Sequence, residues 1–135
     1  MVDAQHAVLT ELEQGPYSRA LRLRIESHSD GAVTVRMPFH LDILNAGGPD
    51  VPIHGGAIAA LADFAACAAV WTMPETRSTA TISITVNYTA PAVHTDLVAQ
   101  ARVRHRGRRI ASLAVDIRDA SRTLIADALV TYKIA

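Results

Sequence analysis

The stretch that decides the fold is His-Gly-Gly-Ala-Ile-Ala-Ala-Leu-Ala-Asp, residues 54–63. Apolar residues continue from it to Trp71 with no further glycine or proline, which predicts one long helix that begins at the glycine pair. The first amides of a helix have no partner within it, so they favour a negative charge close to the helix N-terminus. Asp63 is held among alanines inside this helix and is a candidate general base.

The spacing between the two ends of this stretch has a consequence for assembly. At about 100° per residue, the path from His54 to Asp63 ends on the opposite side of the helix, roughly 13 Å along its axis. Two groups arranged in this way cannot both reach one carbonyl group from a single chain. If both do chemistry, the segment 54–56 must come from one subunit and Asp63 from another. The spacing therefore predicts an obligate homodimer with shared sites.

The composition narrows the class of protein. A length of 135 residues fits one domain, residues 1–135, and with only 4% aromatic residues its core must be built from small aliphatic side chains. Basic and acidic residues number 13 each, which argues against broad binding to nucleic acid or to an anionic membrane. The single cysteine, Cys67, cannot form an internal disulfide, and no secretory signal is visible. We therefore expect a cytoplasmic protein.

The segments on either side of the helix read mostly as strands. A helical stripe over residues 3–14 ends at Gly15-Pro16, and from Tyr17 onward apolar and polar residues alternate as in a half-buried strand. A turn at residues 29–31 leads into a second strand at 33–37, and a long loop rich in glycine and proline follows. The expected loop and later strands are 38–53, 78–89, 96–106, 108–118 and 123–134.

The central helix determines how these strands are arranged. The segment from about Gly55 to Met73 is marginal in length for a membrane span and contains Asp63, so we expect it to lie in a protein core. Because it is apolar on nearly every side, its whole circumference needs cover. The fold class predicted is α+β, with an antiparallel sheet curled around one long helix.

Three motifs resemble those of one known family. They are His-Gly-Gly followed by Leu-Ala-Asp in an apolar helix, the strand Thr81–Ala92 that ends in Tyr-Thr-Ala-Pro-Ala, and Arg106-Gly107-Arg108. Together they resemble the hotdog-fold acyl-CoA thioesterases, most closely the phenylacetic-acid-degradation (PaaI-like) group. The resemblance covers about residues 30–133. It implies a sheet wrapped around a helix, a homodimer with two active sites at its interface, and in many cases a homotetramer.

The resemblance also implies roles for particular residues. The Gly55 amide would polarise the thioester carbonyl, while His54 would orient that carbonyl or the loop. Asp63 of the partner would act as a base or as a nucleophile. The resemblance further suggests a hydroxyl on the following strand, an asparagine before the glycine pair and neighbouring substrate contacts. The candidates for these positions are Thr81, Asn45, Gly56, Ser83 and Cys67.

Ordinary structural roles compete with these assignments. His54 could cap or pack the helix, and Cys67 could be a small core residue. The arginines near residues 102–109 could form a solvated hairpin, although Arg106 and Arg108 would suit coenzyme A phosphates. The remaining histidines show no metal-site spacing, so we expect no metal and no cofactor, with the coenzyme A thioester as substrate.

The favoured function is hydrolysis of a medium-chain or aryl acyl-CoA to the free acid and coenzyme A. One alternative is a dehydratase or hydratase of the same fold, which would need a base facing the carbon next to the carbonyl. A second is a non-catalytic acyl-CoA binding protein. A carboxylate facing the thioester favours the enzyme, since a binding protein has no use for it.

Overall fold

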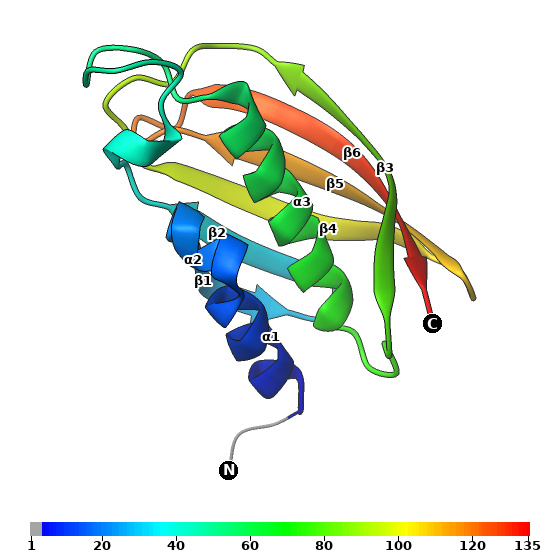
Figure 1. Cartoon of the computed structure of the whole chain (residues 1–135). Helices are drawn as coiled ribbons and strands as arrows, with labels where there is room; N and C mark the ends of the chain where they lie inside the picture. The colour runs from blue at the N-terminus through cyan, green and yellow to red at the C-terminus, as the bar shows by residue number, and fades with distance from the viewer. Residues whose placement is uncertain (1–3) are drawn as a thin grey trace.

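The computed structural model describes residues 4–135, which form a six-stranded antiparallel sheet beside one long helix (Figure 1). The order of the strands across the sheet is β1-β2-β4-β5-β6-β3. The last strand, β6, therefore lies beside β3, which forms one edge of the sheet. The strands are β1 Arg24–Ser29, β2 Ala32–Met37, β3 Thr79–Tyr88, β4 Leu97–Arg106, β5 Ile110–Arg118 and β6 Leu124–Ile134.

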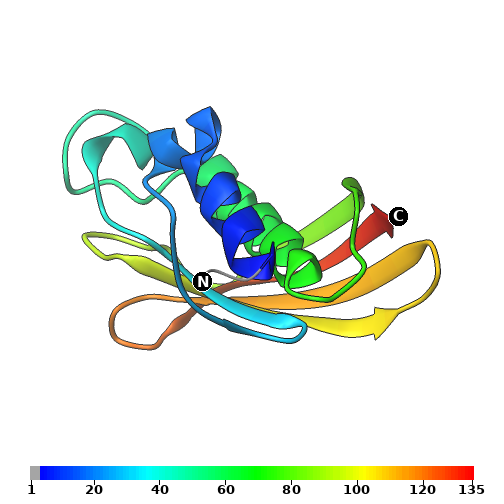
Figure 2. The same ribbon diagram turned by 90° about the horizontal axis from the view of Figure 1, so that it is seen from below.

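The helix α3, Gly55–Trp71, lies across the inner face of this sheet (Figure 1). Figure 2 shows α3 and the N-terminal helix α1, Ala4–Gln14, on the same side of the sheet. Many of the residues that α3 buries are alanines, and their short side chains allow the helix backbone to approach the strands closely. The fully covered ones are Ala62, Ala65, Ala66, Ala68 and Ala69.

The predicted α+β wrap is confirmed, and so are the central helix, the second strand of the hairpin before it and the four later strands, within one or two residues at their ends. Among residues 4–135 no helix is long and apolar enough to cross a membrane. The predicted helix over 3–14 is present as α1, although residue 3 lies outside the described residues.

The prediction of a strand from Tyr17 is wrong for residues 17–23, because β1 begins at Arg24. Residues Pro16–Leu21 form a short helix, α2, with a proline in its first turn. Arg22 ends it in the left-handed conformation at φ 62°, and the amides of Arg22 and Leu23 donate to carbonyls of the last turn. The alternation of Leu21 and Leu23 with arginines therefore marks a helix end followed by a strand.

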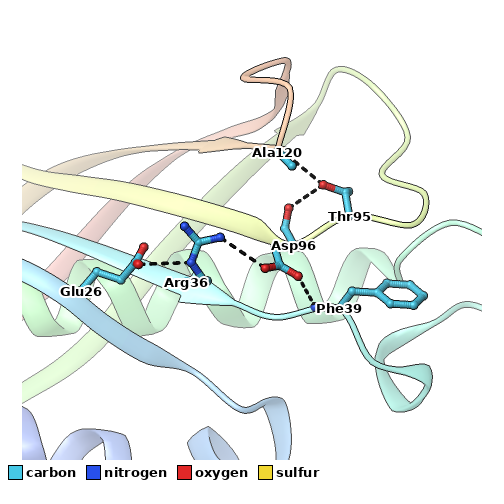
Figure 3. Close-up of polar contacts among 6 residues, drawn as sticks. All are labelled: Glu26, Arg36, Phe39, Thr95, Asp96 and Ala120. Carbon is cyan, nitrogen blue, oxygen red and sulfur yellow. Dashed lines mark hydrogen bonds and ion pairs between the residues drawn. The ribbon is translucent and has the colours of Figure 1, made fainter.

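The long loop after β2 is fixed at its start by a polar network (Figure 3). Asp96 accepts hydrogen bonds from the Phe39 amide at 2.8 Å and from Arg36 at 3.3 Å, and Arg36 also pairs with Glu26 at 3.2 Å. Further along, a short 3-10 helix, η1 Leu41–Ile43, precedes a β-bridge from Leu44 to Ile53. These contacts deliver the chain to the start of α3 in a defined position.

Candidate active site

His54 is the N-cap of α3. Its Nδ1 atom accepts a hydrogen bond from the Gly56 amide at 2.8 Å, so one of the free amides at this helix end is satisfied by the histidine ring. The ring lies so close that a Cβ on residue 56 would stand 2.9 Å from Nδ1. Glycine at position 56 therefore makes room for the cap, and the capping role considered for His54 is present.

The Gly55 amide remains available at the same helix end. Among the described residues no hydrogen bond is made by this amide, whereas the Gly55 carbonyl accepts one from the Tyr88 hydroxyl at 2.7 Å. Gly55, Tyr88 and Asn45 line an open cavity of about 390 Å³. The structure thus brings Asn45 to the glycine end of the helix. It also brings Tyr88 there, a residue of the Tyr-Thr-Ala-Pro-Ala motif to which the sequence assigned no role.

Asp63 lies in a second cavity, of about 300 Å³, between α3, α2 and the inner face of the sheet. Its Oδ1 atom accepts a hydrogen bond from Thr81 on β3 at 2.8 Å, the contact expected of this threonine. It accepts another from Tyr132 on β6 at 2.5 Å. Within residues 4–135 no hydrogen bond reaches Oδ2. The carboxylate is therefore held through one oxygen only.

Tyr132 is the site residue that sequence reasoning missed, because it is far from Asp63 in the chain. It is 2% exposed, and burial raises the pKa of its phenol well above the ordinary value, so it remains a hydrogen-bond donor. A signal was present in the sequence. The inward positions of β6 are otherwise apolar, and a tyrosine on such a face needs a partner for its hydroxyl.

Strict alternation along the strand after the helix predicts that Ser83, two residues after Thr81, shares its face, and this prediction is wrong. Strand β3 contains a bulge at Ile82, where Thr81 pairs with Tyr132 and Ser83 with the next residue of β6, Thr131. Because cross-strand partners share a face, Ser83 lies on the outer side of the sheet, away from Asp63.

Cys67 lines the same cavity as Asp63, one helical turn further along α3. Its sulfur lies 3.6 Å from the Thr79 hydroxyl, and burial raises the pKa of the thiol, which keeps it neutral. Arg106 points to the loop after α3, where it donates to Thr76 at 3.4 Å, while Arg108 is exposed at the tip between β4 and β5. Neither arginine lines the cavity of Gly55 or that of Asp63.

The two halves of the candidate site are separate within one chain. The cavity of Gly55 and the cavity of Asp63 share no lining residue, and about 12 Å of helix lies between the two groups. Each half contributes one group that could take part in the reaction. One presents an unbonded amide at a helix N-terminus, and the other presents a carboxylate with one free oxygen.

Comparison with known proteins identifies the family. A model of the thioesterase superfamily matches residues 53–126, from the approach to α3 into β6. The chain belongs to the thioesterase superfamily. This superfamily member is 33% identical over 100 residues to the esterase-named protein VNG_1336C of Halobacterium salinarum, a match that covers 72% of the chain and 66% of that relative's length.

Solved structures agree with the hotdog fold of this superfamily member. The conserved protein PA5202 of Pseudomonas aeruginosa superposes with a TM-score of 0.83 at 27% identity, covering 93% of this chain and 98% of that one. The PaaI protein of the Escherichia coli phenylacetic acid degradation operon gives 0.80 at 23%, over 95% and 90%. A hypothetical thioesterase of Streptococcus pneumoniae, solved with coenzyme A, gives 0.82 at 22%, over 94% and 96%.

Proposed function

We propose that this protein hydrolyses acyl-CoA thioesters in sites shared between two copies of the chain. The observation that carries the proposal is the division of the chemistry on α3. A free amide at Gly55 and a half-free carboxylate at Asp63 face different cavities of the same protomer. A thioester carbonyl needs both at once, and a second copy supplies the missing half.

Strand β3 is the edge through which we propose that two copies join. Among residues 4–135 it pairs only with β6, and Ile82 and Tyr88 are 54% and 53% exposed along it. An open strand edge of this kind is ready to pair with another strand. Thr81 contacts Asp63, and Tyr88 contacts Gly55. Antiparallel pairing that sets Thr81 opposite the partner's Tyr88 would therefore join the two halves twice per dimer. Such dimers would pair further into tetramers.

The proposed reaction uses water as the attacking group. Asp63 takes one proton from water as its oxygen adds to the carbonyl carbon, and the Gly55 amide stabilises the oxyanion. Collapse breaks the C–S bond, and the departing coenzyme A thiolate takes the proton that Asp63 accepted from water, which restores the carboxylate. Donors of this kind contribute on the order of 3 kcal/mol each. Attack by Asp63 through a mixed anhydride is the alternative route. Neither route needs a metal or a cofactor.

The cavity beside Asp63 supports an acyl group of medium length or an aryl group. Its walls include Leu21, Leu23 and Phe64, which suit an apolar chain. Coenzyme A is proposed as the carrier because the same fold holds it in the Streptococcus pneumoniae structure. We place the activity in the cytoplasm, because a lone cysteine suits a reducing compartment.

The decisive experiment is incubation of the protein with a panel of acyl-CoAs, with release of free thiol followed by a thiol reagent. Thiol release that depends on the protein supports the proposal. Hydration or a shifted double bond without thiol release would identify the dehydratase alternative. Binding of acyl-CoA without turnover would identify a non-catalytic acyl-CoA binding protein.

A further inference from the structure

Asp63 is held by a cross-strand pair of hydroxyl groups. Thr81 on β3 and Tyr132 on β6 are directly opposite each other in the sheet, and both hydroxyls donate to the same Oδ1 atom. The bulge at Ile82 begins immediately after this pair. A bulge bends a strand and changes the direction of the side chains that follow it. The pair of Thr81 and Tyr132 therefore lies where the alternation of side chains along β3 is interrupted.

The distances show what kind of contact this is. The separation of 2.5 Å from Tyr132 to Oδ1 falls in the range of a charge-assisted bond from a hydroxyl to a carboxylate. The Tyr132 phenol is a poor acid at this place, because burial and the neighbouring Cys67 and Asp63 raise its pKa. Tyr132 therefore donates and the carboxylate accepts.

Stability alone does not explain this arrangement. A buried tyrosine hydroxyl needs one partner, and the Asp63 carbonyl oxygen lies within reach at 2.9 Å. The Tyr132 hydroxyl nevertheless lies closer to Oδ1, the same atom to which the Thr81 hydroxyl donates. Two donors on Oδ1 fix the rotation of the carboxylate and leave Oδ2 as the oxygen free to react.

We propose that Tyr132 is a positioning residue for Asp63, which holds Oδ1 together with Thr81 so that only Oδ2 meets the substrate. This inference rests on the proposed thioester hydrolysis. It adds a residue from the last strand to the site and identifies the oxygen that takes the proton from water. Losing the Tyr132 hydroxyl leaves Thr81 as the one remaining donor to Oδ1 among the described residues and frees the carboxylate to rotate.

The test is Tyr132→Phe, which keeps the ring. Its matched control is Thr131→Val, which removes the hydroxyl of the neighbouring β6 residue on the outer face. We expect Tyr132→Phe to lower kcat about tenfold with KM little changed. Thr131→Val should match the wild type. Combining Tyr132→Phe with Thr81→Val should give a non-additive loss, since both act on one oxygen.

A second measurement keeps the inference separable from the proposed activity. In carbon-13 NMR of aspartate-labelled protein, the Asp63 carboxyl resonance is assigned by its loss in Asp63→Asn. At one fixed pH this resonance should shift in Tyr132→Phe, because the hydrogen bond from Tyr132 to Oδ1 is lost, and should keep its wild-type position in Thr131→Val.

The outcomes are distinct. An unchanged Asp63 carboxyl resonance in Tyr132→Phe, or wild-type kcat in that variant where Asp63→Asn is inactive, overturns the role of Tyr132 and leaves thioester hydrolysis standing. A shifted resonance in a protein that hydrolyses no acyl-CoA supports the contact and overturns the proposed function.

Discussion

At the scale of single residues, His54 shows how one side chain sets the chemistry of a helix end. Its Nδ1 accepts from the Gly56 amide, so in the neutral ring the proton is assigned to Nε2. The cap consumes one of the first amides of α3 and leaves that of Gly55 without a partner among the described residues. The amide proposed for catalysis is thus the one that the cap does not use.

Asp63→Asn should lower kcat by about 10²-fold or more, because an amide cannot accept the proton from water. The fold should be retained, since the side-chain oxygen of asparagine can still accept from Thr81 and Tyr132. Steady-state kinetics on the best acyl-CoA of the panel, with circular dichroism as the folding control, tests this. Turnover near that of the wild type would remove Asp63 from the mechanism.

Cys67 predicts how stability responds to alkaline pH. Burial raises the thiol pKa in the folded chain, whereas in the unfolded chain it ionises at about pH 8.5. The folded state therefore binds more protons in this range, so its stability is fully present below about pH 8.5 and falls as the pH rises. Between about pH 8 and 9.5 the Tm of the wild type should fall more than that of Cys67→Ala. Parallel slopes would contradict this.

Local residue patterns predicted part of the site. The motif of residues 54–63 pointed to Gly55 and Asp63, and the contact of Thr81 with Asp63 followed from the family pattern. The catalytic roles stay predictions. Tyr132 could not be found in this way, because its contact joins residues 69 positions apart and depends on the register of β3 against β6.

At the scale of elements, the turn between β1 and β2 is tied to the end of α3. The Gly31 amide donates to the Thr72 hydroxyl at 2.8 Å, and that hydroxyl donates to the Ala69 carbonyl at 2.6 Å. Gly31 has φ 75°, a conformation that glycine adopts without strain. The hairpin and the helix therefore share one buried polar link, 3% exposed at Thr72.

Thr72→Val should destabilise the protein by about 1–3 kcal/mol, because it leaves the buried Gly31 amide without an acceptor. Thr72→Ser keeps the hydroxyl and should cost about 1 kcal/mol for the lost methyl group. The free energy of unfolding in urea, measured at one pH for all three proteins, compares them. Equal stability of the valine and serine variants would show that this link contributes nothing.

The two sequence errors at this scale have one physical cause, which is that a period of two is not unique to a continuous strand. At Leu21 and Leu23 the alternation spans a helix end, because α2 ends at the left-handed Arg22 that lies between them. At Thr81 and Ser83 the alternation is broken by one extra residue, Ile82. The helix end and the bulge both depend on the backbone conformation of a single residue, which cannot be predicted from the residue type.

At the scale of the whole molecule, the division of the site can be tested by mixing subunits. The two variants to be mixed are Gly55→Pro and Asp63→Asn. Proline is well tolerated at the first position of a helix, and His54 already has the extended conformation that precedes proline. The substitution removes the free amide and brings a Cβ to 3.4 Å from the Tyr88 hydroxyl. Each variant alone should be inactive.

Mixed dimers of the two variants should each contain one intact site and one doubly damaged site. Random exchange would therefore restore about a quarter of wild-type activity. The exchange is followed by mass spectrometry of intact dimers, and thiol release is measured in the same samples. If mixed dimers form and activity does not return, the shared site is wrong.

The alanine-lined face of α3 sets the thickness of the layer between helix and sheet. Because these methyl groups are fully covered, a larger side chain such as valine at Ala66 has no room and must lift the helix from the strands. The helix α3 carries the Gly55 amide at its N-terminus and Asp63 near its middle, so a displacement of α3 moves both groups relative to a neighbouring subunit. Substitutions deep in this core, far from any ligand, should therefore register as losses of turnover before they register as losses of folding.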